Sequence, residues 1–130
     1  MKTILVLCTG NSARSQMAQG YLQQFARGRA DVYSAGTNPK GVNPLAVQVM
    51  AEDGVDLSSH TSDHVDKYVG KQFDYVITVC DNAREQCPVF PATAQRIHES
   101  FPDPDSLESF RLVRDQIREF SRQFINQKLL

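Results

Sequence analysis

Apolar and polar positions along this chain form a pattern that predicts strands separated by helices. Short apolar runs occur at 3–7, 31–35 and 73–79, and a weaker run occurs at 95–97. Apolar runs of roughly four to eight residues, bounded by turn residues, are typical of the buried strands of a parallel sheet. The sequence therefore predicts about four such strands.

Helical periodicity fills the segments between and after these strands. Apolar residues spaced three and four apart predict helices over 17–25, ending near Gly28, over 44–54, over 65–69 and over 110–124. Alternation of strands and helices is typical of an α/β fold. We expect a flavodoxin-like, four-stranded parallel sheet with helices on both faces.

Local signals also predict where three of the helices begin. Asn43 before Pro44 is typical of an N-cap followed by proline at the first helical position. The segment 61–63, Thr-Ser-Asp, is most simply a cap for the short helix after it. The segment from Asp105 to Glu108 resembles a capping box, with Asp105 as the cap of the last helix.

Composition narrows the class of protein. A chain of 130 residues suits a single domain, 1–130, and 41% hydrophobic residues with a net charge of −1 are typical of a soluble globular protein. The absence of a basic excess argues against a nucleic-acid partner. The apolar run at the start is too short for a signal peptide or a membrane span, which predicts a cytoplasmic protein. Three cysteines in a reducing compartment are expected to be thiols.

The first predicted strand ends in the most informative stretch of the chain, Cys8-Thr9-Gly10-Asn11-Ser12-Ala13-Arg14-Ser15. It lies between a strand and a helix, where backbone N–H groups and the helix dipole bind an oxyanion. We expect the dipole and Arg14 to stabilise a Cys8 thiolate, and Gly10 to supply a positive φ. Arg14 offers a planar fork that matches two oxyanion oxygens. The alternative is a buried structural cysteine at a strand end.

Two further cysteines follow the third predicted strand. Cys80 should lie on the same carboxyl edge of the sheet as Cys8, and Cys87 is seven residues further on. If the polar segment between them is helical, they are about two turns, or ~10 Å, apart. A disulfide needs Cα atoms within about 7 Å, so the segment would have to loop out. The alternatives are two incidental cysteines, or a zinc pair, which this spacing disfavours.

An aspartate whose backbone is restricted by neighbouring prolines follows the last predicted strand. Prolines flank Asp103, which belongs to a carboxyl-edge loop and could protonate a leaving oxygen. The alternative is a loop aspartate or helix cap. The three histidines, His60, His64 and His98, share no metal-ligand spacing, and we interpret them as surface or loop residues.

With these residues placed, the chain resembles the low-molecular-weight tyrosine phosphatase superfamily, and within it the thioredoxin-coupled arsenate reductases. The resemblance rests on the Cys8 loop and on four further segments, 33–36, 61–63, 79–88 and 101–104. Both branches share the first motif and the Asp-Pro pair, and only the reductases carry cysteines at positions 80 and 87. In the phosphatases an aromatic residue usually follows Asp-Pro, whereas Asp105 follows here.

The resemblance implies a relay of three thiols. Cys8 would attack arsenate held by Arg14 and the loop amides of residues 9–15, while Asp103 protonates the departing oxygen. Cys80 would then attack Cys8 and release arsenite. Cys87 would next attack Cys80 and form a Cys80–Cys87 disulfide, which thioredoxin reduces. Ser15 would hydrogen-bond the Cys8 thiolate, and Asn11 would brace the loop. Phosphate and sulfate are the expected competing oxyanions, and we expect a monomer.

The resemblance also implies a possible potassium site. Asn11, Ser34 and Asp63 match its side-chain ligands, whereas Gln19 stands where several relatives have a glutamate, and Ala13 replaces a frequent cysteine. No other bound cofactor is expected.

Two other functions remain open. One is a phosphatase acting on phosphotyrosine or aryl phosphates through a Cys8 phosphocysteine. The other is a non-enzymatic anion-binding or redox-sensing protein. The electron donor could be thioredoxin, glutaredoxin with glutathione, or another thiol system.

Overall fold

Four parallel strands form the sheet, in the spatial order β2-β1-β3-β4. The computed structural model describes residues 1–81, 83 and 94–129. The strands are β1 (Lys2–Cys8), β2 (Ala30–Gly36), β3 (Tyr75–Thr78) and β4 (Gln95–His98). All four predicted strands are present, and the third is shorter than its apolar run. The sheet confirms the predicted fold class.

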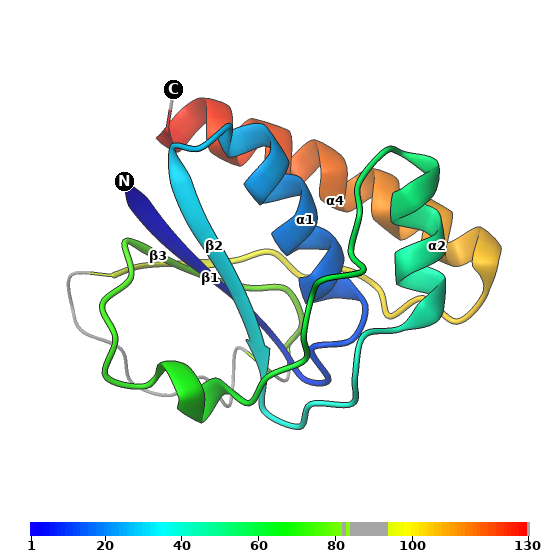
Figure 1. Ribbon diagram of the computed structural model, residues 1–130, viewed down its shortest axis with the longest axis horizontal. Helices are drawn as coiled ribbons and strands as arrows, with labels where there is room; N and C mark the ends of the chain where they lie inside the picture. Colours follow the sequence, from blue (N-terminus) through cyan, green and yellow to red (C-terminus); the bar gives the residue numbers. More distant parts are fainter. Residues whose placement is uncertain (82, 84–93, 130) are drawn as a thin grey trace.

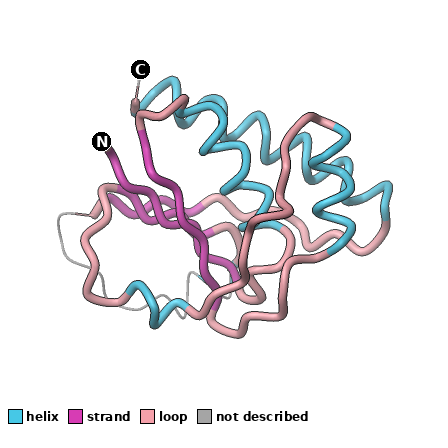
Figure 2. The backbone as a smooth tube through the Cα atoms, viewed as in Figure 1, coloured by secondary structure: helices cyan, strands magenta, loops and turns pink. Residues whose placement is uncertain are grey.

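Three long helices pack together on one side of the sheet. They are α1 (Arg14–Ala26), α2 (Pro44–Glu52) and α4 (Leu107–Lys128), and each pair of them is in contact (Figure 1). The short 3₁₀ helix η1 (Val65–Tyr68) lies on the other side, as the tube in Figure 2 shows. No helix in the described part of the chain is long and apolar enough to cross a membrane.

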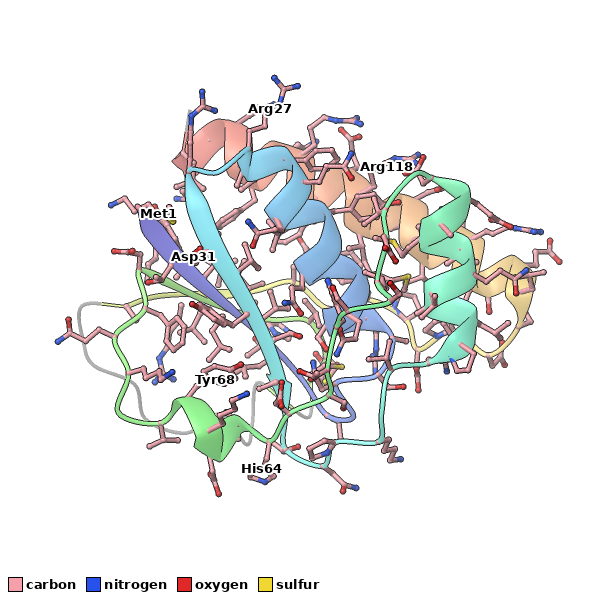
Figure 3. The ribbon with its side chains drawn as sticks, in the orientation of Figure 1. Met1, Arg27, Asp31, His64, Tyr68 and Arg118 are labelled. Carbon is pink, nitrogen blue, oxygen red and sulfur yellow. The ribbon has the colours of Figure 1, made fainter. Side chains whose placement is uncertain are left out.

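Alternation along β2 explains how the two faces are filled. Ser34 hydrogen-bonds Gln19 of α1, so it points toward the three long helices. Its neighbour Tyr33 points to the opposite face, where its ring meets Tyr68 of η1 and Phe73, with centroids 5.6 and 6.0 Å apart. Tyr68 is labelled in Figure 3. The aromatic cluster thus covers part of the face that the long helices leave open.

Two of the predicted helix caps are wrong. The cap of η1 is His64, whose ring accepts a hydrogen bond from the Asp66 N–H, rather than a residue of 61–63. The cap of α4 is Ser106, with Ser109 completing the box, rather than Asp105 with Glu108. Asn43 does cap α2, accepting from the Leu45 N–H at 2.8 Å.

Candidate active site

The loop between β1 and α1 has its carbonyl groups tied to the structure around it. Each of four consecutive carbonyl oxygens accepts a hydrogen bond from outside the turn: Thr9 from the Asn38 N–H (2.8 Å), Gly10 from the Lys40 N–H (2.9 Å), Asn11 from Gln16 Nε2 (3.0 Å) and Ser12 from the Asn43 N–H (2.9 Å). The Gly10 oxygen accepts a second one from Ser62 Oγ (3.3 Å). In a trans peptide, each N–H points opposite to the carbonyl before it. The N–H groups of residues 10–13 therefore point in the direction opposite to the carbonyl groups of residues 9–12.

A pocket of about 440 Å³ lies over this loop. It is lined by Cys8, Thr9, Gly10, Ser12, Ala13 and Arg14 of the loop, and by Lys40, Asn43, Asp103, Pro104 and Phe110 around it. Successive backbone N–H groups at a helix N-terminus form a concave site for anions. The loop, the pocket and the start of α1 together suit a tetrahedral oxyanion.

Asn11 rather than Gly10 takes the strained backbone conformation. Its φ is +44°, in the left-handed region that asparagine tolerates, whereas Gly10 has an ordinary φ. Buried Asn11 donates from Nδ2 to Ser15 Oγ (2.9 Å) and accepts at Oδ1 from the Asp63 N–H (2.9 Å). These side-chain bonds hold the turn, so the predicted role of Gly10 as the positive-φ residue is wrong.

The end of β2 packs directly against the same loop. A Cβ atom on Gly36 would collide with the Thr9 carbonyl oxygen and lie 2.9 Å from the Asn11 nitrogen. Only glycine leaves room for this approach. The loop is therefore held from β2 as well as from α1.

Arg14 and Asp103 meet at the rim of the pocket. Arg14 donates from Nη1 to the Phe101 carbonyl oxygen (3.0 Å), and its Nη2 lies 3.7 Å from Asp103 Oδ1. The Arg14 side chain is 15% exposed and that of Asp103 is 76% exposed. A largely buried cation and an accessible carboxyl group thus lie beside the oxyanion loop.

Cys80 lies against the loop from the neighbouring strand. Its Sγ is 3.4 Å from Thr9 Oγ1 and accepts from the Ala83 N–H at 3.4 Å. Cys8 and Cys80 are both buried and both free thiols. The structure therefore brings together two cysteines that are 72 positions apart in the chain (80 − 8 = 72).

A hydrogen bond couples these two sulfurs. A hydrogen bond from Cys8, helped by those from Thr9 and Ala83, lowers the pKa of Cys80 to about 5. The same bond to Cys80, followed by burial, raises the pKa of Cys8, and Arg14 opposes this only in part. Both directions favour negative charge on Cys80 over negative charge on Cys8. These directions run against the expected Cys8 thiolate, and among the described residues no hydrogen bond joins Ser15 to Cys8.

A family model described as low molecular weight phosphotyrosine protein phosphatase matches residues 3–129. The chain belongs to this family. Its phosphatase fold was predicted from the Cys8 loop and the Asp-Pro pair, and the match confirms that resemblance.

Relatives within the phosphatase family are arsenate reductases by name. A protein of Staphylococcus saprophyticus called arsenate reductase 2 is 45% identical, with 95% of each chain covered. A protein of Halalkalibacterium halodurans called arsenate reductase is 43% identical, over 95% of this chain and 94% of the relative. A solved structure described as an arsenate reductase in the phosphate-binding state has a TM-score of 0.83 and 34% identity, and 98% of each chain is covered.

One predicted site residue of this family member lies outside the described residues. Cys87 falls in 84–93, and its position relative to Cys80 stays a prediction. The structure does bring together Cys8, Arg14, Asp103 and Cys80.

The residues that the resemblance assigned to potassium make contacts within the protein, and the potassium site stays a prediction. Ser34 Oγ donates to Gln19 Oε1 (2.5 Å), and Asn11 Oδ1 accepts from the Asp63 N–H. Lys67 Nζ lies 3.5 Å from Asp63 Oδ1, so an ammonium group already pairs with the one carboxylate. Within the described residues, no group of three His, Cys, Asp or Glu side chains could hold a metal ion.

Sequence analysis missed two residues near the site. Lys40 lines the pocket, and the sequence signal was only its place in a polar loop after the second strand. His98 ends β4, where its ring bonds Thr78 Oγ1 (2.7 Å) and Asp81 Oδ1 (3.0 Å), so it is not a loop residue. It ties β3 to the residue directly after Cys80, a contact that periodicity does not reveal.

Proposed function

We propose that this protein reduces arsenate to arsenite through Cys8, Cys80 and Cys87, with thioredoxin as the final reductant. One observation carries the proposal: the Cys80 sulfur lies beside the oxyanion loop, 3.4 Å from Thr9 Oγ1 and hydrogen-bonded to Cys8. Phosphate-ester hydrolysis needs one thiol at this position, whereas reduction of arsenate needs a second thiol within reach of the first. The names of the relatives point to the same activity.

The oxyanion would bind with its oxygens toward the N–H groups of the loop and toward Arg14. Cys8 must lose its proton to attack arsenic, and the Cys80 sulfur, already its hydrogen-bond partner, is the nearest acceptor. Attack forms a Cys8–arsenic bond and expels one oxygen as water. Asp103, exposed at the rim 3.7 Å from Arg14, would supply the proton to that oxygen.

The second step would transfer two electrons to arsenic. Cys80 first releases to solvent the proton that it took from Cys8, and its thiolate, favoured by hydrogen bonds from Thr9 and Ala83, then attacks Cys8 Sγ. The sulfur–arsenic bond breaks and leaves its electron pair on arsenic, which departs as arsenite. The two sulfurs are oxidised to a Cys8–Cys80 disulfide, which balances the reduction of arsenic from the +5 to the +3 state.

The third step would restore Cys8. The Cys87 thiolate attacks Cys80 Sγ, which frees Cys8 and forms a Cys80–Cys87 disulfide. Thioredoxin, a dithiol, then reduces that disulfide and becomes oxidised itself.

The test is NADPH oxidation after arsenate is added to the protein with thioredoxin and thioredoxin reductase. We expect consumption that requires arsenate, and we expect Cys87→Ser to complete a single turnover and then stop. Wild-type cycling by Cys87→Ser would overturn the relay. Replacing thioredoxin with glutaredoxin and glutathione tests the choice of electron donor.

A phosphatase acting on aryl phosphates is the second candidate, because the loop, Arg14 and Asp103 also suit a phosphocysteine intermediate. It predicts that the double variant Cys80→Ser/Cys87→Ser hydrolyses aryl phosphate at the wild-type rate. Efficient hydrolysis of this kind without arsenate-dependent NADPH oxidation would favour the phosphatase. Weak hydrolysis alone would not, because both branches share the loop.

A further inference from the structure

The side chain of Lys40 lies over the turn of the oxyanion loop. Its Cδ and Cγ atoms would be 3.7 and 3.8 Å from a Cβ placed on Gly10. Its backbone N–H donates to the Gly10 carbonyl oxygen at 2.9 Å, which fixes the base of the side chain beside the pocket. Lys40 is one of the residues that line that pocket.

Lys40 differs from the other cation of the pocket in that its ammonium has no partner among the described residues. Arg14 is held by the Phe101 carbonyl and by Asp103. Within the described part of the chain, no carboxylate or carbonyl oxygen binds the Lys40 ammonium. The side chain is exposed, and four rotatable carbons let the ammonium swing over the pocket.

The charges around the pocket leave room for a second cation. Arg14 already faces the carboxyl group of Asp103, with its Nη2 3.7 Å from Asp103 Oδ1. A dianionic oxyanion entering this site brings two more negative charges, which the single arginine does not balance. The Lys40 ammonium is the positive charge that can move to pair with the bound oxyanion.

We propose that Lys40 is a second cationic ligand of the bound oxyanion, which contacts an outer oxygen of arsenate or phosphate while the loop and Arg14 hold the inner ones. The inference rests on the oxyanion site of the proposed function but not on the reduction step. It assigns Lys40 to affinity for tetrahedral dianions.

The experiment is calorimetric titration of the reduced protein with inorganic phosphate at low ionic strength. We expect Lys40→Gln to weaken phosphate binding about three- to ten-fold, and Lys40→Arg to stay within about two-fold of wild type. The matched control is Lys71→Gln, the same charge change on a lysine that lies against Tyr68. Salt should narrow the gap between wild type and Lys40→Gln.

Each contrary result has a definite meaning. Equal losses in Lys40→Gln and Lys71→Gln, or a loss in Lys40→Arg as large as in Lys40→Gln, would overturn the inference. Wild-type phosphate affinity in Lys40→Gln would overturn it while leaving the proposed function intact. A wild type that binds phosphate in a Lys40-dependent manner but never reduces arsenate would overturn the proposed function alone.

Discussion

At the scale of single residues, the charge of the site depends on two sulfurs that act as a unit. The hydrogen bond between Cys8 and Cys80 lowers the pKa of Cys80, and together with burial it raises the pKa of Cys8. The hydrogen bond stabilises the thiolate on one sulfur and the thiol on the other. This arrangement keeps a nucleophile in the pocket without placing two negative charges side by side.

The hydrogen bond between Cys8 and Cys80 predicts an unusual titration of the two thiols. In a Cys87→Ser background, where Cys8 and Cys80 are the remaining cysteines, one thiolate should be present at neutral pH and should disappear as pH falls through about 5. Replacing Cys8 by Ala removes the largest cause of the low value, so the pKa of Cys80 should rise. Thiolate absorbance in the ultraviolet, followed with pH, measures both.

The control for this titration is Thr9→Val, which removes a lesser hydrogen bond to Cys80 and should raise its pKa by less than Cys8→Ala does. In the Cys87→Ser protein with Cys8 and Cys80 intact, a thiolate that appears only at alkaline pH, or two thiolates at neutral pH, would contradict the claim that Cys8 stabilises a Cys80 thiolate through a hydrogen bond.

Residues of the site were predictable where the signal is local in sequence. Cys8 and Arg14 stand in one loop, and a strand before it with a helix after it is enough to place them. The opposite pKa shifts of Cys8 and Cys80 were not predictable, because they depend on contact between residues 72 positions apart. The positive φ of the loop was also predicted at Gly10 rather than at Asn11. Only the structure shows that hydrogen bonds from the Asn11 side chain hold that conformation.

At the scale of elements, the beginning of α4 sets the position of the Asp103 loop. Ser106 Oγ accepts from the Ser109 N–H at 3.1 Å, and Ser109 Oγ accepts from the backbone N–H of Ser106 and of Asp105 at 2.9 Å. This reciprocal box fixes the first turn two residues after Pro104. The segment that carries Asp103 is therefore anchored from its helical side.

The capping box predicts a difference between two neighbouring substitutions. Ser106→Ala should lower the free energy of unfolding by about 1 kcal/mol, because the first turn of α4 loses its cap. Asp105→Ala, one residue earlier, should cost only about 0.3–0.5 kcal/mol, because it removes a helix-dipole interaction and one exposed hydrogen bond from Ser109 Oγ to Asp105 Oδ1 (3.2 Å). Urea denaturation of both variants measures the difference. A larger loss of unfolding free energy in Asp105→Ala would indicate that Asp105 is the cap, as the sequence predicted.

Element types followed from periodicity, but element ends did not. The apolar runs predicted all four strands, and Asn43-Pro44 predicted the start of α2. The caps of η1 and α4 were missed because Asp, Ser and Thr cluster before both helices, and each of these residue types can cap. The choice among adjacent candidates depends on backbone angles that single residues do not fix.

At the scale of the whole molecule, polar contacts join the three long helices on one side of the sheet. Tyr21 of α1 donates to Asp53 Oδ2 at 2.7 Å, directly after α2, and Arg118 of α4 donates to the same oxygen at 3.0 Å. Arg118 is labelled in Figure 3. Glu52 binds Arg111 and Arg114 beside them. None of these pairs is close in sequence, so helix periodicity could predict the helices but not the network.

The helix network predicts a stability effect that depends on pH. Burial raises the pKa of Tyr21, so its hydroxyl stays protonated and donates to Asp53. That bond, with Arg118, lowers the pKa of Asp53 below its ordinary 3.8. A lowered carboxyl pKa contributes stability that is present above the ordinary value and lost as pH falls through the lowered one.

Tyr21→Phe should therefore destabilise the protein by about 0.5–1 kcal/mol near neutral pH, where the carboxylate is charged and partly screened by solvent. The gap from wild type should shrink in acid, once Asp53 is protonated in both states. Tyr75→Phe is the matched control, because its ring packs on Phe124 and its hydroxyl has no hydrogen-bond partner among the described residues. Urea denaturation across this pH range measures the gap, and one that is unchanged in acid would show that Tyr21 stabilises the helices by packing rather than through the Asp53 carboxylate.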